Sequence, residues 1–342
     1  MSIKNSSTEI KIRDLNLPED YLQMAVLFNL IEPGSTTVEA LEKEDLQIPT
    51  KSNLKLDDNG LLVGFGRTRV VAETLNGEVI GYGACFRAPW TDPGTVGSTF
   101  CVHPDFRSQG VGEMLLYHIV NWAKVHQAAV LTSIVMDWID GSLAFAQKRG
   151  FILDAHVFEL ELNIAQFEVA NYESCLLNQC MDSGIKFSTL ADVQVDEAVS
   201  KLYELYVETS KANPGQYGNV APFEEWKKDF LVEDLYRNDW IFIAVNGYEF
   251  VGFTQLLKTD TEGVVYTNYT CVKNKFRHRG IAKALKVLAI KAAKAQGVQM
   301  ITTDSEENNK PMQHINKTLG FTPGNGHYRI IKQLKEPNSN SE

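Results

Sequence analysis

The chain has 342 residues, a formal net charge of −10, and 44% apolar against 22% charged residues. This length exceeds that of one ordinary core and predicts about two domains, while the composition excludes a fibrous or disordered chain. The acidic balance disfavours nonspecific binding to nucleic acid and mildly favours cationic or amine-bearing substrates.

The cysteines and the N-terminus indicate a cellular compartment. Five scattered cysteines form no Cys-x-x-Cys pair and no Cys/His metal spacing, so they predict free thiols and no metal site. The start, "MSIKNSSTEIKIRD", lacks the apolar segment of a signal peptide, and no run of about 18 apolar residues occurs. We expect a cytoplasmic protein without a membrane partner.

In the first half, an opening strand is predicted at 9–15, followed by amphipathic helices. Strands follow within 61–88, where "LNGEV" carries the Asn-Gly signal of a tight hairpin turn. A further strand ends at Cys101 and Val102. A long helix, a strand over 128–135 and a closing helix that ends at "RGF" complete this half.

The second half repeats this order of elements after a bridging segment, 165–182, that is predicted to be helical. An opening strand lies at 184–190, further strands lie within 239–259, another strand covers 298–304, and the closing helix ends at "LGF". The two halves therefore share one arrangement of elements.

The sequence itself also repeats. "CVHPDFRSQGVG" at 101–112 returns as "CVKNKFRHRGIA" at 271–282, 170 positions later, and "RGF" returns as "LGF" at the same offset. "EVIGYGACF" matches "EFVGFTQLL" at an offset that differs by one residue, as a loop insertion would give. Ordered matches predict two copies of one fold. The predicted parts are residues 1–165, a bridge at 166–183, residues 184–335 and a frayed tail at 336–342.

The long helix of the second half has a clear apolar stripe, with Ile281, Leu285, Leu288 and Ala292 at steps of three and four. The pattern predicts that these residues face the core. It places the lysines of the helix mostly on other faces; these are Lys283, Lys286, Lys291 and Lys294.

Each repeated motif predicts an anion-binding turn between a strand and a helix. Gly110 and Gly280 permit backbone angles that a Cβ would block, and the first amides of the helix then point at an anion. Arg107 and Arg277 add positive charge. The nucleoside-triphosphate P-loop and the dinucleotide fingerprint are both absent.

These residues resemble a known family. "VHPDFRSQGVGEMLL" and "VKNKFRHRGIAKALK" are similar to the acyl-coenzyme A signature of GCN5-related N-acetyltransferases (GNAT), and "TDSEENNKPMQHINKTLGF" resembles tandem, mycothiol-synthase-like members. The resemblance implies an α/β (α+β) fold with two tandem GNAT domains. Each domain would have a mixed, mostly antiparallel sheet, flanking helices, and fourth and fifth strands that splay apart.

The resemblance implies acetyl-coenzyme A (acetyl-CoA) as the cofactor, bound along the fourth strand and at the turn. The implied cofactor-binding residues in the second half are Cys271, Val272, Arg277, His278, Arg279, Gly280, Ile281, Ala282 and Asn309. Those in the first half are Val102, Arg107, Ser108, Gln109, Gly110, Val111 and Gly112. Cys101 and Cys271 are interpreted as packing residues, with a ping-pong acyl-cysteine as the alternative.

The acid that family members often place four residues before the Gly-Phe pair is a tyrosine, and it is missing here. Ala146 and Asn316 occupy those positions. The candidate catalytic substitutes, each with a structural role as its alternative, are Tyr269, Asp304 and Tyr328, with Tyr266 beside them.

The halves are not equivalent. The first keeps Pro104 and Gly112, whereas only the second has Asn309 and Pro311 before its closing helix. We expect chemistry in the C-terminal half and a cofactor-competent turn in the first. The segment 223–230 has an aromatic face surrounded by carboxylates, which fits an amphipathic helix or a lid that attracts an amine.

The sequence therefore predicts an N-acetyltransferase that moves acetyl from acetyl-CoA to a primary amine of a small molecule. The alternative is a non-catalytic protein that binds coenzyme A, which the missing tyrosine favours. Transfer to cell-wall peptides by paired-domain relatives fits poorly, because those relatives usually lack a clean phosphate turn. No oligomer is required, since tandem domains could suffice as a monomer.

Overall fold

The computed structural model describes residues 9–46, 48–49, 51–89, 91–211, 213 and 220–335, and only the backbone of 173–175. The predicted tail at 336–342 lies outside these residues. The chain forms two compact units. Unit 1 comprises Met1–Val135, Ile139–Asp154 and Tyr328–Glu342, and unit 2 comprises Met136–Trp138 and Ala155–His327.

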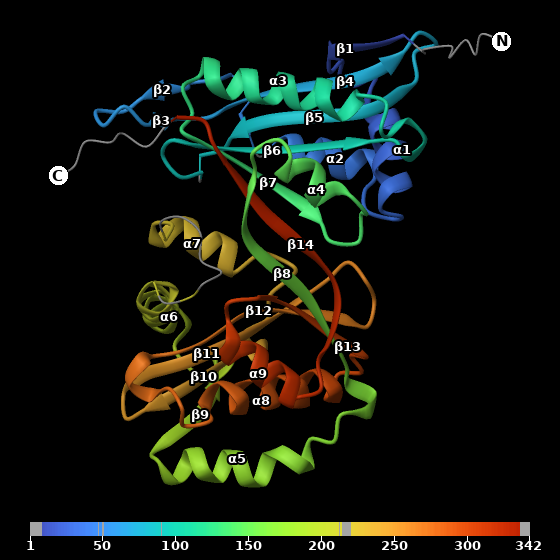
Figure 1. The fold of residues 1–342 in the computed structure, drawn as a ribbon. Coiled ribbons are helices and arrows are strands. Elements are labelled where there is room, and N and C mark those ends of the chain that lie inside the picture. The colour runs from blue at the N-terminus through green and yellow to red at the C-terminus, as the bar shows by residue number, and fades with distance from the viewer. Residues whose placement is uncertain are drawn as a thin grey trace. The chain divides into compact units, whose positions relative to one another are not determined.

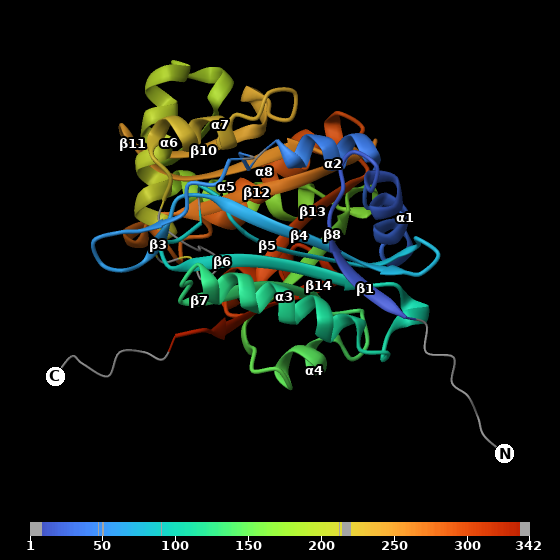
Figure 2. The same ribbon diagram turned by 90° about the horizontal axis from the view of Figure 1, so that it is seen from above.

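Unit 1 is a mostly antiparallel sheet with helices on its faces (Figures 1 and 2). Its strand order is β1-β4-β5-β6-β7-β14, and only β6 and β7 are paired in parallel in the registers of β1 to β7. The strands are β1 (Ile10–Asp14), β4 (Gly66–Thr74), β5 (Val79–Arg87), β6 (Thr95–Val102), β7 (Val130–Met136) and β14 (Thr322–Gln333). A small second sheet pairs β2 (Lys55–Leu56) with β3 (Leu62–Val63).

The helices of unit 1 are α1 (Tyr21–Ile31), α2 (Val38–Asp45), α3 (Val111–Val125) and α4 (Ser142–Gln147). Periodicity predicts an apolar stripe on α3 that consists of Val111, Leu115, Ile119, Trp122 and Val125. Leu115 and Ile119 are fully buried as predicted, whereas Val125 is exposed because it ends the helix. Figure 2 shows α3 lying along this sheet. In the predicted hairpin, Gly77 has a positive φ of 81° between β4 and β5, so the Asn-Gly turn is confirmed.

Unit 2 repeats this design with strand order β8-β13-β12-β11-β10-β9. Its strands are β8 (Ile152–Asn163), β9 (Ile185–Thr189), β10 (Ile241–Asn246), β11 (Glu249–Lys258), β12 (Val264–Val272) and β13 (Met300–Glu306). Its helices are α5 (Ala170–Asp182), α6 (Val195–Ser210), α7 (Phe223–Phe230), α8 (Ile281–Ala295) and α9 (Lys310–Thr318). The bridging segment is therefore helical, as predicted.

Two apolar clusters cover the two faces of the unit 2 sheet. One contains the stripe of α8 and residues of α5 and α9, and the other contains α6 and α7 (Figure 1). Trp226 and Phe230 of α7 are buried in the second cluster, which supports the interpretation of this segment as an amphipathic helix.

The last strand of each sequence repeat packs into the other unit. In unit 2, β8 pairs antiparallel with β13, from Asn163 opposite Met300 to Val157 opposite Glu306. In unit 1, Ile330 of β14 is buried in the core. The compact units therefore differ from the contiguous halves that the repeat predicts. Strand pairing is nonlocal, so similarity between segments does not reveal which partner a strand takes.

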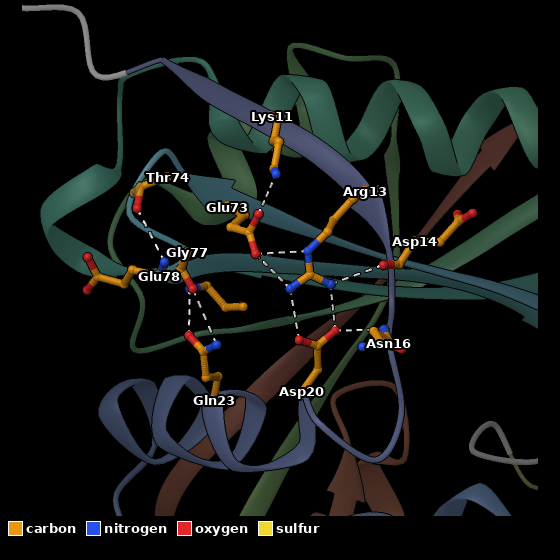
Figure 3. Close-up of polar contacts among 11 residues, drawn as sticks. Lys11, Arg13, Asp14, Asn16, Asp20, Gln23, Glu73, Thr74, Gly77 and Glu78 are labelled. Carbon is orange, nitrogen blue, oxygen red and sulfur yellow. Dashed lines mark hydrogen bonds and ion pairs between the residues drawn. The ribbon is translucent and has the colours of Figure 1, made fainter.

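A charged network fixes the edge of unit 1 (Figure 3). Arg13 of β1 donates to Asp20 with both terminal nitrogens, at 2.7 and 2.8 Å, and to Glu73 of β4 at 2.9 Å. Asp20 is the N-cap of α1 and is buried. These bonds join two strands and the start of a helix.

Candidate functional site

Each unit contains a parallel strand pair that separates partway along its length. In unit 1, β6 and β7 pair from Thr95 opposite Val130 to Ser98 opposite Ser133. In unit 2, β12 and β13 pair from Val264 opposite Met300 only to Tyr266 opposite Thr302. Both strands continue beyond the last pair, so the predicted splayed pair is confirmed. We call the unpaired ends of β12 and β13 the divergence of unit 2.

Strand β12 contains a bulge that β6 lacks. Gln255 of β11 lies opposite Tyr269 while Leu256 lies opposite Thr267, so Asn268 is an extra residue. The register of β5 and β6 runs without interruption. A bulge bends a strand and redirects its side chains, and bulges are common beside active sites. Only unit 2 therefore has this feature at its divergence.

The one-residue change in repeat offset results from a difference in loop length, which the bulge partly offsets. Unit 2 has a shorter connection between β11 and β12, at 259–263, than the 88–94 connection in unit 1. That loop loses two residues, and the bulge restores one. The longer loop of unit 1 is therefore the cause, as expected, and the bulge makes Gly97 the counterpart of Tyr266 by strand register.

The glycine turns have nearly the same geometry in both units. Gly110 and Gly280 cap α3 and α8 in the left-handed region, with φ of 90° and 79°. Arg107 and Arg277 each donate from Nε to the last carbonyl of the preceding strand, at 3.2 and 3.1 Å. The exposed N–H groups at the start of each helix favour an anion. At Gly280 a Cβ would lie 2.9 Å from the end of the Leu176 side chain of α5, and the positive φ favours glycine there.

The charges around the two turns differ strongly. Residues 103–113 contain one arginine against an aspartate and a glutamate, a net charge of −1. Residues 273–283 contain three lysines and two arginines, a net charge of +5. Glu249 and Glu208 pair with two of these lysines, Lys273 and Lys275, on one side of the turn. Coenzyme A carries several phosphate charges, so the turn of unit 2 is the better electrostatic match.

In unit 1, side chains of α4 cover the start of α3. A Cβ at Gly112 would lie 3.3 Å from the ring of Phe145, which also contacts Phe100 with ring centroids 6.0 Å apart. The guanidinium of Arg149 stacks 3.6 Å from the centre of the Phe145 ring and pairs with Glu113 at 2.9 Å. An acidic residue and an aromatic ring thus lie beside Gly112 in the first turn of α3, whereas a Cβ at Gly110 would meet nothing within 4 Å.

Two predicted catalytic residues lie together at the divergence of unit 2. The Tyr266 hydroxyl donates to Oδ2 of Asp304 at 3.1 Å. Burial, followed by the charge of Asp304, raises the pKa of Tyr266 above its ordinary value. Opposite Asp304 on β8 lies Glu159. The counterparts of Tyr266 and Asp304 in unit 1 are Gly97 and Ile134, which have no acid–base function.

The other two predicted catalytic residues lie elsewhere. Tyr269 contacts the rings of Tyr206 and Phe253, and its hydroxyl lies 3.3 Å from that of Thr209. Tyr328 packs against the core of unit 1. The structure therefore places Tyr269 in the α6 layer and Tyr328 at the core of unit 1.

The predicted cofactor residues have varied surroundings. Burial raises the pKa of both Cys101 and Cys271 to about 12, which favours the packing role over a thiolate nucleophile. Val111 and Ile281 point into the cores, so only their backbone amides could face a ligand. Asn309 caps α9, its side-chain oxygen accepting the Met312 N–H at 3.4 Å.

The remaining predicted residues form the turns themselves. Ser108 and His278 adopt positive φ values of 61° and 63°, and Gln109 and Arg279 each donate to a backbone carbonyl four residues earlier. Val102 and Val272 end the strands, and Gly112 and Ala282 lie in the first turn of each helix.

Comparison with known proteins agrees with this geometry. The model of the acetyltransferase (GNAT) family matches residues 34–151 and 199–321. The chain belongs to this GNAT family. No curated protein matches. Membership supports acyl transfer in general, and a tandem arrangement of two GNAT-type domains is confirmed.

Solved GNAT structures share the fold across nearly the whole chain. A GCN5-related N-acetyltransferase from Sphaerobacter thermophilus is 16% identical, with 96% of both chains covered and a TM-score of 0.69. A tandem GNAT protein from the clavulanic acid biosynthesis pathway is 17% identical, with 96% of this chain and 100% of that chain covered, at a TM-score of 0.64. A glucosamine N-acetyltransferase region of a fungal multi-domain enzyme is 14% identical, with 95% of this chain and 38% of that chain covered, at a TM-score of 0.69.

Sequence reasoning missed one residue of this GNAT chain. Lys286 was expected on the polar side of α8, but it is buried, at 3% exposure. The expectation was wrong because one helix face contacts both the sheet and the neighbouring helix. An alignment of the two repeats gives the missing signal, because Lys286 aligns with Leu116, which is buried. Among the described residues, no helix is long and apolar enough to cross a membrane and no cluster suits a metal ion.

Proposed function

We propose that unit 2 transfers acetyl from acetyl-CoA directly to a primary amine of a small molecule, and that unit 1 is non-catalytic. The observation that carries this proposal is the Tyr266–Asp304 pair at the divergence. The strand that contains Tyr266 leads directly into a strongly cationic turn. Unit 1 has neither the acid–base pair nor the cationic turn.

The residues of unit 2 suit the parts of such a transfer. The turn at 277–282 would hold the diphosphate by its backbone N–H groups, with Arg277 and Arg279 adding charge. An alkyl ammonium with a pKa near 10 must lose a proton before it can attack, and a carboxylate can receive that proton. Asp304 is the proposed base, and the Tyr266 hydroxyl orients its carboxylate.

The charge near the divergence supports a cationic acceptor. Asp304 and Glu159 lie opposite each other on neighbouring strands, so both side chains leave the same face of the sheet. Two carboxylates there attract an ammonium group. Amino sugars are one such class, and the fungal structural neighbour is described as a glucosamine N-acetyltransferase region.

A non-catalytic coenzyme A-binding role is the second candidate, because Asn316 occupies the place of the usual tyrosine acid. Thiol release from acetyl-CoA across a panel of amines separates the two. Catalysis predicts amine-dependent release in the wild-type protein. If the protein binds acetyl-CoA but releases no thiol with any amine, the non-catalytic binding role is supported.

A matched pair of variants tests which turn is used. Arg279→Glu reverses a charge at the turn of unit 2, and Gln109→Glu introduces the same residue at the corresponding position of unit 1. We expect calorimetry to show one acetyl-CoA site per chain. Arg279→Glu should weaken that site about tenfold or more, while Gln109→Glu leaves it unchanged. The reverse pattern would assign the cofactor to unit 1.

A further inference from the structure

Unit 2 buries an amine that its fold does not need. Lys286 of α8 is 3% exposed, and its Nζ lies 5.0 Å from the centre of the Phe321 ring. Burial lowers its pKa to about 7, and no charged neighbour among the described residues contributes to that shift. An amine in this setting gains or loses a proton easily near neutral pH.

Two further polar side chains are buried in this unit without hydrogen-bond partners. Asn316 of α9 is 1% exposed and has no partner for either side-chain atom, and Oγ of Ser305 in β13 also has none. The Asn316 carbonyl accepts the Phe321 N–H at 3.0 Å, so Phe321 contacts both Asn316 and Lys286. Each unsatisfied buried group costs about 1–3 kcal/mol of stability.

Unit 1 shows that the fold accepts apolar residues at all three positions. The counterparts of Lys286, Asn316 and Ser305 are Leu116, Ala146 and Val135. All three pack in one apolar cluster together with Phe151, the counterpart of Phe321. The corresponding three side chains of unit 2 therefore share one layer beneath α8 and α9. They form a destabilising polar set that packing alone does not explain.

The polar set lies on the opposite face of β13 from the proposed base. Asp304 and Ser305 are consecutive residues of one strand, so their side chains leave opposite faces of the sheet. Beyond Tyr266 and Thr302, no pair joins β12 to β13. The carboxylate of Asp304 and the polar set that includes Ser305 thus lie on opposite faces of the strand that borders the divergence.

We propose that Lys286 is the proton donor to the sulfur that leaves in the acyl transfer of unit 2, with Asn316 and Ser305 as the buried polar groups that can accept hydrogen bonds from its ammonium. This inference rests on the proposed function. The amine nitrogen forms a bond to the carbonyl carbon, and the carbon–sulfur bond breaks with its electron pair on sulfur. The Lys286 ammonium gives that sulfur a proton. The nitrogen loses two protons through Asp304 to water, and Lys286 recovers one proton from water.

The chemistry fits the groups present. A thiol has an ordinary pKa near 8.5, so an ammonium of similar acidity can protonate a thiolate without a large energy penalty. After donation, Lys286 is a neutral amine, which a buried apolar layer tolerates better than a charge. The amide oxygen of Asn316 can accept a hydrogen bond from the ammonium, which orients the donated proton.

The test is Lys286→Leu, which places the residue of unit 1 in unit 2. We expect a folded protein with an equal or higher Tm, because a buried amine whose charged form is disfavoured by desolvation is removed. We also expect kcat with acetyl-CoA to fall about 100-fold, with KM for acetyl-CoA within about threefold. Lys201→Leu, which removes an exposed lysine of α6, is the matched control and should leave kcat unchanged.

A binding measurement separates proton donation from a structural role. At pH 7.5, between the pKa of Lys286, about 7, and the ordinary thiol pKa near 8.5, wild-type protein should bind coenzyme A at least about tenfold more tightly than desulfo-coenzyme A, since only the former offers a sulfur that can share a proton with Lys286. The Lys286→Leu variant should bind both equally. Equal binding by the wild-type protein overturns the inference even if the variant does not fold.

The two proposals fail in different ways. Wild-type protein that neither binds acetyl-CoA nor releases thiol contradicts the proposed function. Wild-type protein that turns over, with a Lys286→Leu variant that keeps kcat within about threefold, overturns the role of Lys286 alone.

Discussion

Asp304 is the residue whose surroundings most resemble those of a general base. It receives a hydrogen bond from Tyr266, lies opposite Glu159, and follows the point where two strands separate. Its exposure keeps it accessible to an amine, whereas Tyr269 is held in an aromatic cluster. Residue identity alone did not separate these candidates, because each is a plausible proton acceptor or donor.

Replacing Asp304 by asparagine tests this role. Asp304→Asn keeps the shape and removes the proton acceptor, so kcat should fall about 100-fold at neutral pH while affinity for acetyl-CoA is kept. Ile134→Asn makes the same residue at the matching position of unit 1, where Ile134 is exposed, and should leave turnover unchanged. Initial rates of thiol release measure both, and a fully active Asp304→Asn variant would contradict the assignment.

At the scale of elements, the turn before each long helix is the part that both units retain, and the differences lie around it. In unit 2 a bulge precedes the turn and α5 packs against Gly280. In unit 1 the strands run in register, and Phe145 of α4 covers the first turn of α3. Repeating a motif therefore does not repeat its site, because neighbouring elements decide what can approach it.

The network around Arg13 shows how charges can fix elements together, and it predicts a pH dependence (Figure 3). The hydrogen bonds from Arg13 hold the pKa of Asp20 below its ordinary value. This stabilisation is complete above the unfolded pKa of about 3.9 and is lost as pH falls through the lower folded value. Arg13→Met should cost about 2 kcal/mol at pH 7 and flatten that acid dependence.

Urea unfolding of unit 1 at pH 7, and at several values between pH 4 and pH 2, measures the free energy of unfolding and its dependence on pH. Lys11→Met removes an exposed partner of Glu73 and serves as the control, with an expected change below about 0.5 kcal/mol. If both variants keep the wild-type acid dependence, the Arg13–Asp20 bonds do not link proton binding to folding.

At the scale of the whole molecule, the chain divides into units that do not follow its order. Ile330 belongs to the second repeat but is buried in the core of unit 1, and Leu162 belongs to the first repeat but is buried in the core of unit 2. Each unit therefore depends on a strand from the other repeat, and neither repeat holds a complete core by itself.

Alanine substitutions test this exchange. Ile330→Ala should destabilise unit 1, and Leu162→Ala should destabilise unit 2, each by about 2–4 kcal/mol, because each leaves a cavity in a buried core. Hydrogen exchange followed by mass spectrometry locates the loss of protection. Ile330→Ala should reduce protection in unit 1, and Leu162→Ala should reduce it in unit 2. Loss of protection in unit 2 for Ile330→Ala, or in unit 1 for Leu162→Ala, would contradict the exchanged arrangement.

The sequence by itself determined the features that depend on local pattern. The repeat at an offset of 170, the Asn-Gly hairpin, the stripe of α3 and the strand–glycine–helix order all follow from residues close in the chain. The family follows from the same segments. Such features are predictable because backbone angles and helix periodicity respond to near neighbours.

The tertiary structure alone decided what depends on distant partners. It joined Tyr266 to Asp304, placed Tyr328 at the core of unit 1, and buried Lys286 where helix periodicity predicted an exposed side. It also placed the last strand of each repeat in the other unit. These outcomes arise from strand register and from packing between residues far apart in the chain. A local sequence pattern does not specify which of several similar partners a strand or side chain will contact.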